Sequence, residues 1–76
     1  MGTENDRIWP VITKNIEQAL KNQGLNRNAL ASKSRIAKST LYRNIDQPEK
    51  FTGRELGQIA EALGLPLEEL IKDVAA

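Results

Sequence analysis

The stretch LNRNALASKSRIAKSTLYRNID, residues 25–46, predicts two short helices joined by a tight turn. Asn26 is a side chain that commonly caps a helix, and the apolar spacing after it predicts a helix over residues 27–33. A turn over residues 34–36 follows, and helical spacing resumes over residues 37–46. Because a turn this short forces the two helices to cross steeply, the pattern predicts a helix-turn-helix unit. Its inward-facing positions are Leu30, Ala31, Leu41 and Ile45.

The second helix of this unit leaves a polar stripe on its outer face, made of Lys38, Ser39, Tyr42 and Arg43. The surrounding segment, residues 18–45, carries six basic residues and no acidic one, although the 76-residue chain has a net charge of only +1. The flanking segments 1–17 and 46–76 sum to −1 and −4. An acid-free segment of this kind is typical of a surface that binds a polyanion. The alternative is a solvated face that happens to lack acids, and the helical stripe favours the polyanion.

A longer helix is predicted over residues 8–23, ahead of the helix-turn-helix unit. Asp6 is its expected cap, and Pro10 is expected in the first turn, where a missing N–H costs little. Gly24 follows as a stop signal. Trp9 is expected to pack at the edge of the core against the last helix, with a dimer contact as the alternative. The inward stripe of this helix is Ile8, Ile12, Ile16, Ala19, Leu20 and Gln23.

Two more helices are predicted after the helix-turn-helix unit. Thr52 and Glu55 have the spacing of a capping box, which opens a helix over residues 53–63. Gly64 ends this helix, and a fifth helix over residues 66–74 begins at the next proline with an acidic first turn. The inward positions of the two helices are Leu56, Ile59, Ala60, Leu63, Leu67, Leu70, Ile71 and Val74.

Length and composition limit the chain to a single small domain, residues 1–76. With no cysteine and no histidine, it has no disulfide and lacks the commonest general base and metal ligand. An enzyme would need paired carboxylates or a tuned lysine, and no motif supports either. No apolar run approaches the ~20 residues that span a membrane, and the polar N-terminus is not a secretory signal. We therefore expect a cytoplasmic binding domain without enzymatic activity, cofactor or metal.

Two stretches of the chain resemble one known family. Residues 25–43 resemble the helix-turn-helix of the lambda repressor/Cro (XRE) family, and residues 56–71, LGQIAEALGLPLEELI, resemble its fourth and fifth helices. Together the resemblance covers residues 16–72. It implies an all-α fold, a compact bundle of five short helices with the helix-turn-helix at helices 2 and 3. Family members are sequence-specific DNA-binding transcription regulators of bacteria and phages. The resemblance thus implies double-stranded DNA as partner, bound by a Cro-like repressor or a domain of a longer one.

Three features depart from the usual pattern of that family. Arg35 stands in the turn where a glycine or small residue is usual, and a left-handed backbone there is costly for a non-glycine residue. Ala37 stands where Ser or Thr usually caps the third helix. Because alanine has no capping side chain, the helix loses ~1 kcal/mol of stabilisation. The loop over residues 46–51 lacks the usual glycine. These departures leave the fold intact but affect the angle of the third helix and the backbone contacts of the loop.

The resemblance implies that the helix over residues 37–46 lies in the DNA major groove, with its N-terminal half against base edges. Arg43 is the strongest candidate for a base contact, because a guanidinium can donate to both acceptors of a guanine. Such a contact is worth ~1–3 kcal/mol of discrimination against other bases. Lys38 can reach a guanine or a phosphate. Tyr42 can touch a thymine methyl or a phosphate, or simply pack against Asp46 or Lys38. The implied base contacts are Lys38, Ser39, Tyr42 and Arg43.

Phosphate contacts are expected to position the protein without reading sequence. Asn26 and Arg27 begin a helix, where free N–H groups and the helix dipole attract phosphate, although Asn26 can equally serve only as a cap. Arg35 is either a phosphate contact or a solvated charge. About five such contacts make affinity fall steeply with salt, with a slope near −0.9 per phosphate. The expected phosphate contacts are Asn26, Arg27, Arg35, Lys50 and Arg54, the last of which matches a family contact at the start of the fourth helix.

A second function, from a different class, is a module of the same fold that binds a protein, such as an antitoxin or an antirepressor-like partner. A large exposed apolar patch would favour it, and the sequence has none beyond the positions assigned to the core. Family members usually bind two half-sites about one helical turn, ~34 Å, apart as dimers. We therefore expect an operator with the form of an inverted repeat, bound by a monomer or by a weak homodimer that forms on DNA.

Overall fold

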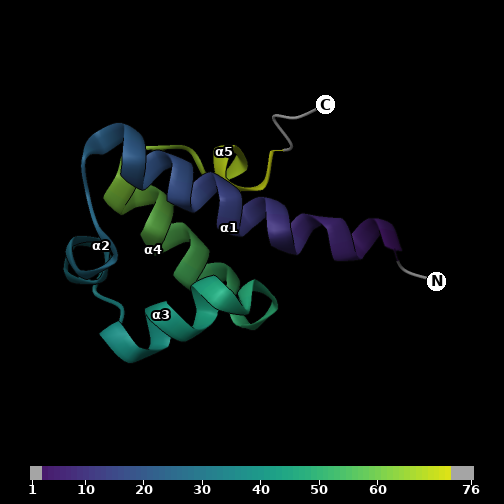
Figure 1. Cartoon of the computed structure of the whole chain (residues 1–76), viewed down its shortest axis with the longest axis horizontal. Helices are drawn as coiled ribbons and strands as arrows, with labels where there is room; N and C mark the ends of the chain where they lie inside the picture. Colours follow the sequence, from purple (N-terminus) through teal and green to yellow (C-terminus); the bar gives the residue numbers. More distant parts are fainter. Residues whose placement is uncertain (1–2, 73–76) are drawn as a thin grey trace.

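The computed structural model describes residues 3–72, which form a bundle of helices without strands in that range. The expected all-α bundle is confirmed. Figure 1 shows the long first helix running across the molecule, with α4 running obliquely between α1 and α3, and with α3 at the opposite side of the bundle from α5. The elements of the described range are α1 (Thr3–Gln23), α2 (Arg27–Ser34), α3 (Lys38–Asp46), the 3₁₀ turn η1 (Pro48–Lys50), α4 (Gly53–Leu63) and α5 (Leu67–Ile71).

The core forms where α4 packs against α2 and α5, and where α1 packs against α5 and η1. Every inward position predicted for the second, third and fourth helices is buried. Ile36 and Phe51, which lie outside the predicted helices, are buried as well. On α1 the stripe is confirmed from Ile12 to Leu20, whereas Ile8 packs at the edge of the core. Gln23 is exposed instead of inward, and its side-chain amide donates to the Leu63 carbonyl at 2.8 Å.

The first helix begins earlier than the sequence predicts, at Thr3 instead of residue 8. Asp6 therefore lies within α1 and does not cap it, and Pro10 lies in the helix interior, beyond the first turn. A proline there removes the hydrogen bond to the carbonyl four residues earlier. The sequence prediction started the helix near Pro10 because proline favours the first turn, but that preference does not bar a proline from lying further along a helix.

The fifth helix is shorter than predicted, since α5 begins after Pro66 and ends at Ile71 rather than at residue 74. Asn15 of α1 supplies a reason: its side-chain amide donates to the carbonyls of Leu70 at 2.8 Å and Lys72 at 2.7 Å. These bonds satisfy acceptors at the end of the helix. Val74 lies outside the described residues.

The inward face predicted for the fifth helix is correct only in part. Leu70 is fully buried, but Leu67 is 43% exposed and Ile71 is 40% exposed. A helix of five residues presents little more than one turn, so a single position faces the core while its neighbours face outward. The prediction that Leu67 and Ile71 close the core is therefore wrong.

The turn and cap signals around the helix-turn-helix unit are confirmed. The Asn26 side chain accepts from the N–H of Ala29 at 2.8 Å. Thr52 and Glu55 form the capping box, with both bonds at 3.0 Å. Gly24 and Gly64 adopt positive φ at the ends of α1 and α4. The boundaries of the two central helices differ slightly: α2 runs one residue further, to Ser34, and α3 begins at Lys38, because Ala37 has an extended ψ of 137°.

The backbone of the connecting turn carries the strain expected from its sequence. Arg35 has φ 62° and ψ 31°, the left-handed conformation, and is the one non-glycine residue with positive φ in the described range. Its N–H and that of Ile36 both bond to the Ala31 carbonyl. Ala37 follows without a side-chain capping bond, so the N-terminus of α3 has no polar restraint of its own.

Candidate nucleic-acid interface

The outer face of α3 presents the polar stripe that the sequence predicts. Lys38, Ser39 and Arg43 are exposed, whereas Leu41 and Ile45 are fully buried. This helix begins with a basic residue and has no acid in its first turn. A rigid helix therefore carries two cationic side chains and a hydroxyl into solvent on one side.

Tyr42 lies differently from the rest of that stripe, because it is half-buried and turned toward α2. Its hydroxyl donates to Oδ1 of Asn28 at 2.8 Å. The ring lies 5.6 Å from the guanidinium carbon of Arg27. The structure thus places Tyr42 as a link between α3 and α2, with contacts to Asn28 and Arg27 rather than the expected packing against Asp46 or Lys38.

Asn44 is a polar residue of α3 that sequence reasoning missed, and it is 1% exposed. Its Oδ1 accepts from Nε of Arg43 at 3.2 Å, and its Nδ2 donates to Oε1 of Glu55 at 3.4 Å. The same carboxylate oxygen accepts from the N–H of Thr52. Asn44 therefore joins the α4 capping box to the base of the Arg43 side chain. The sequence did contain a signal for this position: Asn44 follows Leu41 by three residues and therefore shares its buried face.

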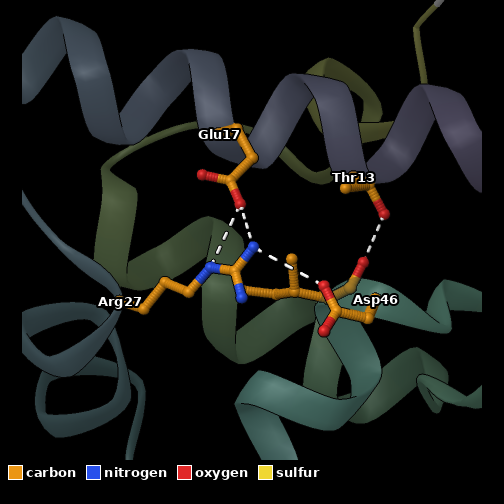
Figure 2. Close-up of polar contacts among 5 residues, drawn as sticks. Thr13, Glu17, Arg27 and Asp46 are labelled. Carbon is orange, nitrogen blue, oxygen red and sulfur yellow. Dashed lines mark hydrogen bonds and ion pairs between the residues drawn. The ribbon is translucent and has the colours of Figure 1, made fainter.

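Arg27 occupies the junction of three helices, where Figure 2 shows it between Glu17 and Asp46. Its Nε and Nη2 donate to Oε2 of Glu17, on α1, at 3.1 and 2.6 Å. Nη2 also lies 3.6 Å from Oδ1 of Asp46, the last residue of α3. The hydrogen bond to Glu17, with the charge of both carboxylates, raises the pKa of Arg27 further above its already high usual value. The guanidinium is therefore permanently charged and already paired with the carboxylates of Glu17 and Asp46.

The other expected phosphate contacts are exposed, and two of them come together. Arg35, at the end of α2, and Arg54, in the first turn of α4, line one polar depression. Gln58 spans its floor, donating to the Ser34 carbonyl at 2.9 Å. Lys50 stands apart at the end of η1, and the Asn26 oxygen is occupied as a cap. Three cationic side chains, on the turn after α2, on η1 and on α4, are thus exposed in addition to the stripe of α3.

Trp9 is half-buried at the edge of the core, as expected. It borders a depression with Ile45 of α3 and Pro48 of η1. The helix that carries it, α1, packs against both η1 and α5. The contact of Trp9 with the fifth helix stays a prediction.

The part of the chain that the structure describes, residues 3–72, holds no cluster suited to a metal ion and no helix suited to a membrane. No three metal-ligating side chains of the kinds His, Cys, Asp and Glu gather in this range. The helices of the same range are each too short or too polar to cross a bilayer.

Comparison with known proteins places this geometry in a family. A family model described as the Cro/C1-type HTH DNA-binding domain matches residues 15–76. Comparisons with curated proteins and with solved structures give no match. The matched range includes the second half of α1 and all of α2 to α5, with the turn at Arg35 between the two central helices. The chain belongs to the Cro/C1-type helix-turn-helix DNA-binding domain family.

Proposed function

We propose that this protein is a sequence-specific regulator of transcription that binds double-stranded DNA with α3 in the major groove. The observation that carries the proposal is the exposed stripe of α3, whose Lys38, Ser39 and Arg43 project from a helix anchored by fully buried Leu41 and Ile45. A helix of this width fits the major groove, where each base pair presents a distinct pattern of donors and acceptors. The N-terminal half of α3 then meets base edges.

Arg43 is the residue assigned to guanine in this proposal. Its Nε is held by Asn44 at 3.2 Å, so the terminal amino groups of the guanidinium remain available for a base. A bidentate contact with guanine contributes about 1–3 kcal/mol of discrimination. Lys38 adds a contact to guanine or phosphate, and Ser39 adds a hydroxyl that reads little by itself. Tyr42 supports α3 and contributes its ring edge to a thymine methyl.

Arg35, Arg54 and Lys50 are assigned to phosphates, together with the N–H groups that open α2 behind Asn26. They lie on the elements that flank α3, and all three cationic side chains are exposed. Such contacts set the register of the protein on the duplex. Three to four of them predict a slope of roughly −3 to −4 for the logarithm of affinity against the logarithm of salt concentration.

The finer biological role that we assign is that of a Cro-like repressor in a bacterium or a phage-infected cell. Binding to paired half-sites suits a domain this small, because two weak contacts on one duplex reinforce each other. The operator is then an inverted repeat, with the two protomers meeting weakly or only on DNA.

A protein-binding module, such as an antitoxin or antirepressor-like partner, is the second candidate. One observation favours it: Leu67 and Ile71, four residues apart on α5, are both exposed apolar side chains. They occupy the short α5, across the bundle from α3. A partner protein would therefore leave the stripe of α3 free, whereas DNA would cover it.

Selection of binding sites from a random duplex pool tests the proposal. Wild type, Arg43→Ala and the control Lys21→Ala are compared at two salt concentrations; Lys21 is an exposed cation in the last turn of α1. We expect wild type and Lys21→Ala to enrich the same motif, and Arg43→Ala to lose a guanine preference while it keeps the salt slope. If wild type enriches nothing even at low salt, the DNA-binding function is refuted.

A further inference from the structure

Arg27 is the point at which α1, α2 and α3 are joined by polar contacts (Figure 2). We propose that Arg27 is a positioning residue, which fixes the orientation of α3 relative to α1 and α2 instead of binding a DNA phosphate. The inference rests on the proposed DNA-binding function. It replaces the phosphate contact expected for this residue from its place at the start of a helix.

The first reason is that the guanidinium is already committed to a carboxylate. Two of its N–H groups converge on one oxygen of Glu17, and the shorter bond is 2.6 Å. Hydrogen bonds between charged groups are shorter and stronger than neutral ones. The Arg27 side chain is 30% exposed, so it is partly withdrawn from solvent. Turning it toward a phosphate would break this pair and leave the Glu17 carboxylate facing the duplex without its partner.

The second reason is that Arg27 contacts α3 twice on one face of that helix. Tyr42 lies beneath the guanidinium, and Asp46 lies beside it at 3.6 Å. The two residues are four apart and hence one turn apart on the helix. A cation over an aromatic ring is attracted to its face. A single guanidinium therefore restrains both the middle and the end of α3.

The third reason is that α3 has few other connections to α1. The helix packs mainly against α2 and η1. Its N-terminus follows the strained turn at Arg35 and lacks a capping side chain at Ala37. A second polar link, from Thr13 Oγ1 to the Ile45 carbonyl at 2.7 Å, lies next to Arg27 in Figure 2. The angle of α3 is consequently set from its C-terminal end, where these links gather.

The ion pair between Arg27 and Asp46 also affects the charge of the surface assigned to DNA. Its carboxylate is 70% exposed at the end of α3, close to the surface assigned to DNA. The positive charge of Arg27 offsets this negative charge, which would otherwise repel the phosphate backbone. If Arg27 turned away to bind DNA, the negative charge of Asp46 would no longer be offset.

Operator affinity, measured across a series of salt concentrations for wild type and variants of the full chain, tests the inference. The variants are Arg27→Gln, Glu17→Gln and the charge swap Glu17→Arg with Arg27→Glu. Lys21→Gln serves as the control, because it removes the same charge from an exposed site on α1. Circular dichroism of each variant at the binding temperature corrects the affinities for the folded fraction.

We expect Arg27→Gln to lower operator affinity by roughly fivefold, which corresponds to about 1 kcal/mol of lost restraint. Glu17→Gln should lower it by a smaller factor, because it leaves Arg27 in contact with Tyr42 and Asp46. Both should keep the wild-type salt slope and weaken the preference at the guanine assigned to Arg43. The charge swap should recover only part of the lost affinity, because it rebuilds the ion pair between positions 17 and 27 but takes the cation away from Tyr42 and Asp46. Lys21→Gln should leave the affinity and the motif unchanged.

The opposite pattern identifies a phosphate contact and overturns the inference. Arg27→Gln would then reduce the magnitude of the salt slope by about 0.9, Glu17→Gln would keep or increase affinity, and the charge swap would not rescue binding. A loss of folding stability with unchanged affinity per folded molecule would also overturn it, since the role would be purely structural. If wild type itself selects no motif, the proposed function fails, and this inference fails with it.

Discussion

Replacing Arg35 by glycine should stabilise the fold and weaken DNA binding at the same time. Arg35 holds a left-handed backbone, φ 62° and ψ 31°, between α2 and α3. This conformation costs an L-residue about 1–2 kcal/mol, and glycine escapes that cost. Glycine also gains freedom in the unfolded chain, which takes back about 0.5–1 kcal/mol. The net gain is therefore about 0.5–1 kcal/mol in the free energy of unfolding.

The bonds that shape this turn do not depend on the side chain. The N–H groups of Arg35 and Ile36 bond to the Ala31 carbonyl, and both remain in the glycine variant. For a domain of this length, 1 kcal/mol shifts the melting temperature by about 4–8 °C, so we expect a rise of about 2–8 °C for Arg35→Gly. Thermal and urea unfolding followed by circular dichroism measure it.

Arg35→Ala is the matched control, because it removes the same charge but keeps the strain. Its stability should stay close to that of wild type, below that of Arg35→Gly. On the selected operator, both variants should reduce the magnitude of the salt slope by about 0.9, since both lose one phosphate contact. The reasoning about strain is refuted if Arg35→Gly is no more stable than Arg35→Ala. Unchanged salt slopes in both would remove Arg35 from the phosphate contacts.

Three further changes, the last with a matched control variant, test the local structure by urea unfolding. Ala37→Ser should raise stability by about 0.5–1 kcal/mol, because it supplies the missing cap of α3; no gain would mean that the extended backbone there cannot place a hydroxyl on α3. Thr52→Ala should lower stability by about 0.5–2 kcal/mol through loss of the α4 capping box, and an intact stability would contradict that box. Leu70→Ala should cost about 2–5 kcal/mol, since Leu70 is fully buried. Leu67→Ala, on the exposed face of α5, should cost far less, and equal losses would argue that both side chains face the core.

Much of the candidate interface could be read from the sequence because its signals are local. The Asn26 cap, the Thr52 capping box and the glycine stops each involve atoms within a few residues of one another. The stripe of α3 follows in part from the helical repeat, which places Ser39 and Arg43 away from the buried Leu41, while Lys38 is exposed as the first residue of the helix. Backbone geometry within one or two turns is enough to determine such features.

The partners of polar side chains could not be read in the same way. Nothing near Arg27 in the sequence indicates that Glu17, ten residues earlier on another helix, holds its guanidinium. The end of α5 depends on Asn15, which reaches across 55 residues to the Leu70 carbonyl. The role of Asn44 depends on Glu55 of α4. Each of these contacts exists only after the helices have packed.

The sequence alone therefore determined the order of the helices, the left-handed turn at Arg35 and the cationic stripe of α3. The tertiary structure decided which basic residues remain free for a ligand and which are already paired with other side chains. Arg54 lines an open depression, whereas Arg27 is paired with Glu17. The physical reason is that helix signals act over one or two turns of backbone. The environment of a charged side chain is instead created by whichever helix packs beside it.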